Sequence, residues 1–352
     1  MEDSSYNSNN DFKFTEGWIS GFVQSDGCFT ITFEKKSTGL FIKPKPIFVL
    51  TQDASEEKLF KSLREFLGVG YITKNKTDVS YYITSLKGLR DILFPILDKN
   101  PLKYGKLKAY LIFKNIVEQM LNKNHLKLDG LLCIIYASFN LNVETGRRTK
   151  ESKDNLLNFL ESKHGKLSAP EELARSQPVS LIHSAVNISN MNNSCLSDDD
   201  INKSPLTLDF ISGLIDGDGS FNVTFQIKPY RRVRVNFTVV QETSCKKLLH
   251  ELKSYFSCGA VYDLPSSASR FQVENIDLML NNIKPVLDKI KLNTYKAKNY
   301  DIAIKVCEII RTKGYKTNDV LKEIVELAYD SNKYGKRRRI SKEEFMKKIS
   351  ES

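Results

Sequence analysis

One pattern occurs twice in this chain, and that duplication constrains the fold more than any other feature. Residues 18–29 read WISGFVQSDGCF, and residues 210–221 read FISGLIDGDGSF. Aligning Asp26 with Asp218 gives an offset of 192 residues, and Gln52 and Gln241 follow at 189. A domain typically holds ~100–200 residues, so each copy is long enough to form a core of its own.

Further matches continue along both copies at nearly the same offset. They are Gly70 with Gly259, the run 95–98 (PILD) with 285–288 (PVLD), and Leu102, Lys106, Lys108 and Tyr110 with Leu292, Lys296, Lys298 and Tyr300. The matches keep their order with little drift. The chain is therefore predicted to be a pseudo-twofold duplication.

Within each copy the apolar period changes from that of a helix to that of a strand. Residues 15–25 and 207–217 carry apolar side chains and glycine at helical spacing, and each run ends at Asp-Gly. Alternation follows over 222–228 and 232–239, which predicts a hairpin with one buried face. The expected order is α-β-β-α-β-β-α-α, twice. Antiparallel sheets with helices on one face make this an α+β fold.

Composition shifts divide the chain into five predicted segments. Residues 143–205 hold few large apolar side chains apart from 155–160, where a short helix is expected. The predicted segments are a disordered N-terminus at 1–11, a first repeat at 12–142, a partly disordered linker at 143–205, a second repeat at 206–340 and a basic C-terminal tail at 341–352.

The charge balance favours a polyanionic partner. Lys and Arg outnumber Asp and Glu by 53 to 42, which gives a net charge of +11, and nucleic acid is the commonest partner of such a surplus. A basic enzyme without nucleic acid remains an alternative. No apolar run approaches the ~20 residues of a membrane span, and the start of the chain lacks the features of a secretory signal. The six cysteines include no C-x-x-C pair, so neither a zinc site nor a disulfide framework is expected.

The two motif copies resemble the LAGLIDADG homing endonucleases, in their single-chain, two-repeat form. The resemblance includes the spacing to Gln52 and Gln241, the run 68–71 (GVGY), the stretch 101–106 (PLKYGK) and the closing 334–339 (YGKRRR). It implies a duplicated fold with saddle-shaped antiparallel sheets, a monomer that acts on double-stranded DNA, and a gene carried inside an intron. An organellar location is expected from the same resemblance, with the mitochondrion favoured over the chloroplast.

The resemblance also implies a set of catalytic residues. Asp26 and Asp218, the acids before the last glycine of each motif, would bind divalent metal, and oxygen ligands with waters suit Mg²⁺. A helix dipole disfavours carboxylates at these C-terminal ends, which argues independently for a function. Gln52 and Gln241 would hold water near the metals, and Lys106 and Lys296 would lie near the scissile phosphate. The alternatives are Asp-Gly turns, ordinary strand-end glutamines and surface lysines.

One motif position differs between the copies. The sixth position is Gln24 in the first copy and Asp216 in the second. We expect this position at the mouth of the site, where the difference would make the two strand cleavages unequal.

The polar faces of the hairpins are predicted to read DNA. A two-stranded ribbon fits the major groove, where each base pair shows its own donor and acceptor pattern. Arg232 and Arg234 suit guanine, Asn236 and Gln226 suit adenine, and Lys228, Lys43 and Lys45 suit phosphates. The remaining predicted contacts are Thr30, Thr32, Asn222, Thr224 and Thr238 on the hairpins, and Lys336, Arg337 and Arg338 near the C-terminus. The alternatives are a solvated sheet face and, for the last three, a disordered basic tail or a nuclear-import run.

Three functions are compatible with this sequence. The first is a site-specific endonuclease that hydrolyses both strands of a long non-palindromic target with a divalent metal and leaves short 3′ overhangs. The second is a maturase that binds intron RNA and assists group I splicing, alone or together with cleavage. The third is a catalytically silent DNA-binding protein on the same scaffold. Acids at both Asp26 and Asp218 favour the first function.

Overall fold

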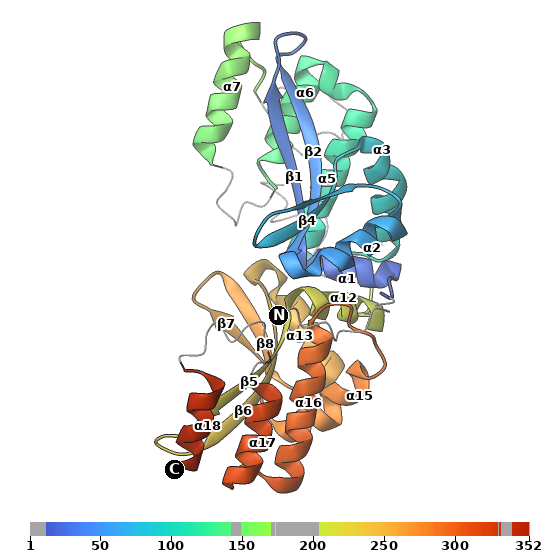
Figure 1. Ribbon diagram of the computed structural model, residues 1–352. Helices are drawn as coiled ribbons and strands as arrows, with labels where there is room; N and C mark the ends of the chain where they lie inside the picture. The colour runs from blue at the N-terminus through green and yellow to red at the C-terminus, as the bar shows by residue number, and fades with distance from the viewer. Residues whose placement is uncertain are drawn as a thin grey trace. The chain divides into compact units, whose positions relative to one another are not determined.

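The two copies build matching four-stranded antiparallel sheets, as the computed structural model shows for residues 12–141, 149–169, 173, 204–329, 331 and 340–351 (Figure 1). The first sheet contains β1 (Gly27–Lys35), β2 (Ile42–Asp53), β3 (Tyr71–Lys74) and β4 (Asp78–Ile83), in the order β1-β2-β4-β3. The second contains β5 (Gly219–Gln226), β6 (Arg232–Glu242), β7 (Ala260–Leu264) and β8 (Ala268–Val273), in the order β5-β6-β8-β7. The duplicated α+β fold is confirmed.

The described helices repeat in the same order. The first copy has α1 (Glu16–Asp26), α2 (Glu57–Leu67), α3 (Leu86–Gly88), α4 (Phe94–Lys99), α5 (Tyr104–Leu121), α6 (Leu128–Ser138) and α7 (Lys150–His164). The second has α12 (Leu208–Asp218), α13 (Lys246–Phe256), α14 (Ile276–Leu278), α15 (Lys284–Leu287), α16 (Lys296–Lys313), α17 (Asn318–Ala328) and α18 (Lys342–Ser350). Even a five-residue π-helical stretch recurs, at Leu89–Leu93 and Met279–Ile283. No helix in the described ranges is long and apolar enough to span a membrane.

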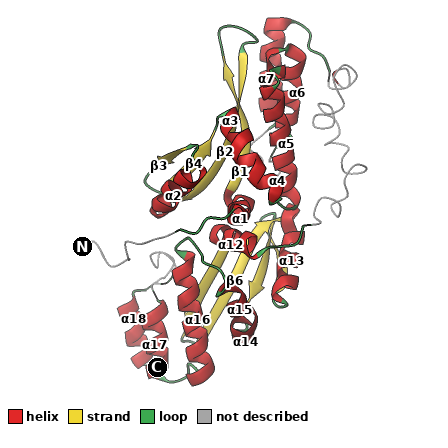
Figure 2. Cartoon of the chain, turned by 90° about the vertical axis from the view of Figure 1, so that its right-hand side faces the viewer, coloured by secondary structure: helices red, strands yellow, loops and turns green. Residues whose placement is uncertain are grey.

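Helices cover one face of each sheet (Figure 2). Aromatic side chains pack between the helices and the sheets. In the second copy, Phe221 of β5 stacks on Phe237 of β6 at 4.8 Å between ring centroids, and Tyr300 of α16 meets Phe221 at 5.4 Å. The alternate side chains of both strands, such as Asn222 and Arg234, are partly or fully exposed on the opposite face. The period-2 pattern therefore separates a core face from an open polar face in each sheet.

Helix α1 packs with the second copy although its sequence belongs to the first. The chain divides into two compact units: one combines the residues up to Ser25 with those from Leu206 onward, and the other runs from Asp26 to Pro205. A Cβ atom on Gly21 of α1 would lie 1.9 Å from the Phe210 carbonyl oxygen, and one on Gly213 of α12 would lie 2.0 Å from the Trp18 carbonyl oxygen. Glycine is therefore required at both positions, because the two helix backbones touch there.

Helix α7 lies inside the segment predicted to be a linker. The expected helix at 155–160 is the centre of a longer one, whose Leu160 is fully buried against Ile42 of β2 and Leu131 of α6. The Lys35 ammonium also sits 4.4 Å from the centre of the Phe159 ring. These apolar side chains pack against residues of β1, β2 and α6, so residues 150–164 are a folded part of the unit that runs from Asp26 to Pro205 (Figure 1).

Helix α18 has the same relation to the second sheet. Its Phe345 packs against Phe225 of β5 and Tyr329, with ring centroids 5.8 and 5.5 Å apart. Residues 342–350 of the predicted tail therefore form a docked helix. The predicted N-terminus at 1–11, and the linker residues 143–148, 170–172 and 174–203, lie outside the described residues.

The glycine contacts lead to a stability prediction. Gly21→Ala should lower the free energy of unfolding by about 3 kcal/mol, since the added methyl group overlaps a carbonyl oxygen that cannot move without its helix. Gly39→Ala is the control. A Cβ there meets nothing within 4 Å, so its cost of about 1–2 kcal/mol comes from the positive φ alone. Urea unfolding of both variants measures the difference. Equal losses would contradict the close packing of α1 on α12.

Candidate active site

Each copy places one aspartate at the last residue of its motif helix. Asp26 ends α1 and Asp218 ends α12, and a strand begins at the next residue in both cases. Both carboxylates are partly exposed, so they can reach solvent or a ligand. Among the described residues, no group of three or more His, Cys, Asp or Glu side chains forms a metal cage.

The donor chemistry at these helix ends fits Mg²⁺. A helix leaves its last carbonyl oxygens without partners in the helix, so each carboxylate sits beside further oxygen donors. Mg²⁺ is commonly held by one or two carboxylates, with waters and substrate phosphate oxygens as the remaining ligands. A single aspartate in each copy is therefore enough for a site that DNA phosphates complete.

The predicted glutamines contact the predicted aspartates. Gln52 Nε2 donates to Asp26 Oδ2 at 2.6 Å, and Gln241 Nε2 donates to Asp218 Oδ2 at 2.5 Å. Both glutamines lie near the ends of their strands, β2 and β6, in the register that brings them beside the helix ends. The same arrangement therefore occurs in both copies. The roles of these residues in cleavage stay predictions.

The predicted lysines donate to backbone carbonyls next to the aspartates. Lys106 Nζ donates to the Gly27 carbonyl at 2.7 Å, and Lys296 Nζ donates to the Gly217 carbonyl. Gly27 follows Asp26 in the chain, whereas Gly217 precedes Asp218. Each ammonium group is therefore held near the end of the motif helix that carries the aspartate, and its role at the phosphate stays a prediction.

Asp216 is buried, so the expectation that it lies at the mouth of the site is wrong. Its side chain is 0% exposed and accepts hydrogen bonds from Trp18 Nε1 (2.8 Å), the Asn293 amide (2.8 Å), and the amide and hydroxyl of Thr294 (2.9 and 2.6 Å). Burial raises the pKa of this carboxyl, and the four donors oppose that rise. Asp216 lies two residues before Asp218, so the helical period turns its side chain to a different face of α12. On that face it joins α12 to α1 and to the segment that leads into α16.

Gln24, at the same motif position, has different partners. It is 1% exposed, and its Nε2 donates to Gln241 Oε1 at 3.3 Å and to Cys245 Sγ at 3.6 Å. The residue at this motif position therefore holds helices together in the second copy, as Asp216. In the first copy, as Gln24, it contacts the predicted site residue Gln241.

The predicted DNA contacts that the structure describes lie on or beside the open faces of the sheets. In the second sheet, Asn222 is opposite Asn236, Thr224 opposite Arg234 and Gln226 opposite Arg232. Thr238 continues this face, and exposed Lys228 follows β5. In the first sheet, Thr30, Thr32, Lys43 and Lys45 share the open face, where Lys45 pairs with Glu34. Lys336, Arg337 and Arg338 lie outside the described residues.

Sequence reasoning missed the outward side chains of the second hairpin in each sheet. Arg270 of β8 lies between Val240 and Tyr262, and its buried Nε has no hydrogen-bond partner. In the first sheet, Tyr71 stacks on Tyr82 at 5.2 Å. Ser80 of β4 and Gln272 of β8 are further outward residues. The alternation in 78–83 and 268–273 carries the signal that could have found them.

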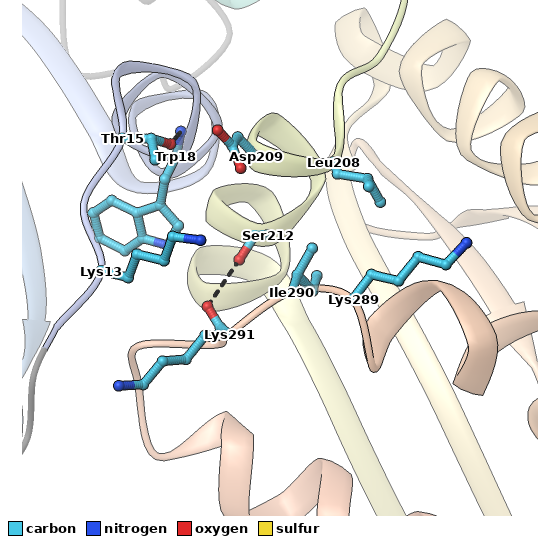
Figure 3. Close-up of a pocket in the computed structure, with 9 residues that line it drawn as sticks. All are labelled: Lys13, Thr15, Trp18, Leu208, Asp209, Ser212, Lys289, Ile290 and Lys291. Atoms are coloured by element: carbon cyan, nitrogen blue, oxygen red, sulfur yellow. Dashed lines mark hydrogen bonds between the residues drawn. The ribbon is translucent and has the colours of Figure 1, made fainter.

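A small pocket opens at the other end of the motif helices (Figure 3). Lys13, Thr15, Trp18, Leu208, Asp209, Ser212, Lys289, Ile290 and Lys291 line it. Ser212 Oγ donates to the Lys291 carbonyl at 3.2 Å across this pocket. Leu208 begins α12 and Asp218 ends it, so about 15 Å of helix separates the pocket from the carboxylate. The pocket is therefore not the site of the predicted chemistry.

The duplicated sheets, the paired motif helices and the repeated aspartate–glutamine–lysine sets define a family. The profile of the LAGLIDADG endonuclease family matches residues 19–117 and 211–307. The chain is also 34% identical over 292 residues to the probable intron-encoded DNA endonuclease 1 of Mycosarcoma maydis, with 83% of this chain and 98% of that protein covered. This chain belongs to the LAGLIDADG endonuclease family.

Other relatives extend the comparison. The probable intron-encoded endonuclease 2 of Neurospora crassa is 24% identical over 322 residues, which cover 88% of this chain and 63% of that protein. Among solved structures, the I-SmaMI LAGLIDADG homing endonuclease bound to cleaved DNA superposes with a TM-score of 0.74 at 26% identity, over 93% of this chain and 99% of that one. The meganuclease I-CpaMI bound to uncleaved DNA has a TM-score of 0.73 over 91% of this chain and all of that one, at 24% identity, a likeness of fold.

The environment of Asp216 leads to a second stability prediction. Asp216→Asn should lower the free energy of unfolding by about 1–3 kcal/mol, because the new amide group faces hydrogen-bond donors and leaves at least one of them unsatisfied. Asp209→Asn, an exposed change in the first turn of the same helix, should cost less than about 1 kcal/mol. Denaturant unfolding compares the two. A loss at Asp216 no larger than that at Asp209 would contradict the structural role.

Proposed function

We propose that this protein is a site-specific double-strand DNA endonuclease in which each copy of the motif supplies the residues that cut one strand. The observation that carries the proposal is the repeated arrangement of an aspartate at a helix end, a glutamine amide on its carboxylate, and a lysine ammonium on an adjacent carbonyl. A DNA duplex offers two phosphodiester bonds related by a pseudo-twofold axis, so a duplicated set matches a duplicated substrate. The DNA-bound structures of the similar I-SmaMI support this assignment.

Asp26 and Asp218 would hold the divalent metal, for which we propose Mg²⁺. A metal bound there lowers the pKa of a coordinated water and stabilises negative charge on the phosphate. Gln52 and Gln241 fix the orientation of the carboxylates and offer polar atoms to water. Lys106 and Lys296 supply positive charge where the phosphate gains negative charge in the transition state.

The open sheet faces would read the target. Arg232, Arg234 and Asn236 have donor and acceptor groups that match base edges in the major groove, and the lysines match phosphates. The two faces differ in composition. Lys43-Pro44-Lys45 stands where the second copy has Arg232-Val233-Arg234. Because the two halves would contact DNA with different side chains, we expect a single chain to recognise a long, non-palindromic target.

The relatives support a proposal for the biological setting. Several are named as intron-encoded endonucleases of fungi, and one is named for ND4 intron 1 of Podospora anserina. We extend this to an intron-encoded protein of the mitochondrion that leaves short 3′ overhangs. Complete sets of site residues in both copies favour cleavage over a purely RNA-binding maturase or a silent DNA-binding protein, because neither of those needs the acids.

The acids can be tested one at a time. Asp26→Asn and Asp218→Asn should each lower double-strand cleavage in Mg²⁺ by at least ~100-fold, because each removes the charge that holds the metal on one strand. Binding to DNA in Ca²⁺ should remain. Asp277→Asn, an exposed acid at the start of α14, is the control and should cut normally. Cleavage that persists in EDTA, or normal cutting by both site variants, would refute the assignment.

DNA reading can be tested on the two sheets. Arg234→Ala should cost about 1–3 kcal/mol at one base pair and relax the preference there, if its guanidinium makes a bidentate contact with guanine. Lys43→Ala should weaken binding to all sequences alike and reduce the dependence of log K on log salt by about one. Competition binding with a target library at several salt concentrations measures both. An exchange of these two outcomes would show that the roles are assigned wrongly.

A further inference from the structure

A hydrogen-bonded chain connects the first motif helix to the aspartate of the second copy. Gln24 Nε2 of α1 donates to Gln241 Oε1 at 3.3 Å, and Gln241 Nε2 donates to Asp218 Oδ2 at 2.5 Å. The middle residue thus uses both ends of its amide group. Gln24 belongs to the first repeat by sequence, yet it contacts the glutamine of the second.

The chemistry of the three groups permits only one direction along this chain. An ionised carboxylate accepts hydrogen bonds and donates none, so Gln241 must turn its NH₂ group toward Asp218. Its carbonyl oxygen then faces Gln24 and requires a donor, which the NH₂ group of Gln24 provides. Because Gln24 is 1% exposed and Gln241 is 6% exposed, water is a poor substitute for either partner. Asp218 and Gln24 therefore favour the same orientation of the Gln241 amide, and an acceptor at position 24 would oppose it.

The other copy does not use this motif position in the same way. Asp216 accepts hydrogen bonds from Trp18, Asn293 and Thr294, which belong to the packing of α12. Gln24 thus provides an amide donor beside Gln241. Asp216, at the equivalent position of the other motif, holds α12 against its neighbours instead.

We propose that Gln24 is a positioning residue for the second-copy site, which acts by holding the Gln241 amide with its NH₂ group on Asp218. This inference rests on the proposed endonuclease function. A carboxylate at position 24 would accept from Gln241, reverse its amide, and turn its carbonyl oxygen against the Asp218 carboxylate. The strand cut by the second copy would then be cut slowly, and the other strand would be cut at its normal rate.

The test is a strand-resolved nicking assay on a cognate duplex labelled at both 5′ ends. The strand that Asp218→Asn fails to cut identifies the strand assigned to the second copy. Gln24→Glu should slow that strand about tenfold or more, since it removes a hydrogen bond to a charged group, and a singly nicked intermediate should accumulate. The other strand should change less than about twofold by the same reasoning.

Two further variants separate the route of the effect. Gln24→Met keeps the length of the side chain without a donor, so it should slow the same strand, and it serves as the second probe if Gln24→Glu folds poorly. Cys245→Ala removes the sulfur acceptor of Gln24 Nε2 and should leave the strand ratio unchanged, because Gln241 keeps its donor.

A metal-free measurement tests the hydrogen bonds directly. The side-chain amide resonance of Gln241, assigned from its loss in Gln241→Glu, should shift in Gln24→Glu when the NH₂ group leaves Asp218. A resonance that does not move, or equal slowing of both strands, overturns the positioning role. Absence of metal-dependent cleavage by the unmodified protein would instead refute the proposed endonuclease function, and the resonance would still report on the amide orientation.

Discussion

The close contact between the backbones of α1 and α12 is the interaction on which the rest of the structure depends. At Gly21 and Gly213 a single added carbon atom would overlap the carbonyl oxygen of the facing helix. Two helices can approach this closely only where side chains are absent. The contact brings a helix from the first copy into the unit formed by the second.

The site residues follow from the direction of these helices. Since each helix ends at an aspartate and continues directly into a strand, the carboxylate position is set by backbone geometry rather than by a flexible loop. The neighbouring strand then supplies the glutamine, and the first turn of the long helix α5 or α16 supplies the lysine. Three elements of ordinary geometry thus assemble the same polar set twice.

The duplication has nevertheless diverged where the two copies meet inside one unit. Asp216 is locked by four donors, whereas Gln24 reaches the Gln241 amide. Residues at equivalent positions therefore have different structural roles. Only a single-chain protein permits this, because the two subunits of a homodimer carry the same residue at each position. The open sheet faces have diverged in the same sense, with lysines on the first hairpin of one sheet and arginines at the equivalent positions of the other.

The repeat and the order of helices and strands could be predicted from the sequence, because they depend on spacing and period along the chain. The family resemblance pointed to the aspartates and glutamines that the structure brings into contact. The fate of position six could not be predicted, since Gln24 and Asp216 acquire their partners from segments up to 221 residues away. For the same reason the local pattern of residues 150–164 indicates a linker, because their apolar side chains complete a core that β2 and α6 supply. The local sequence pattern determined the helices and strands. Long-range packing decided which polar groups are buried and which stay accessible to a ligand.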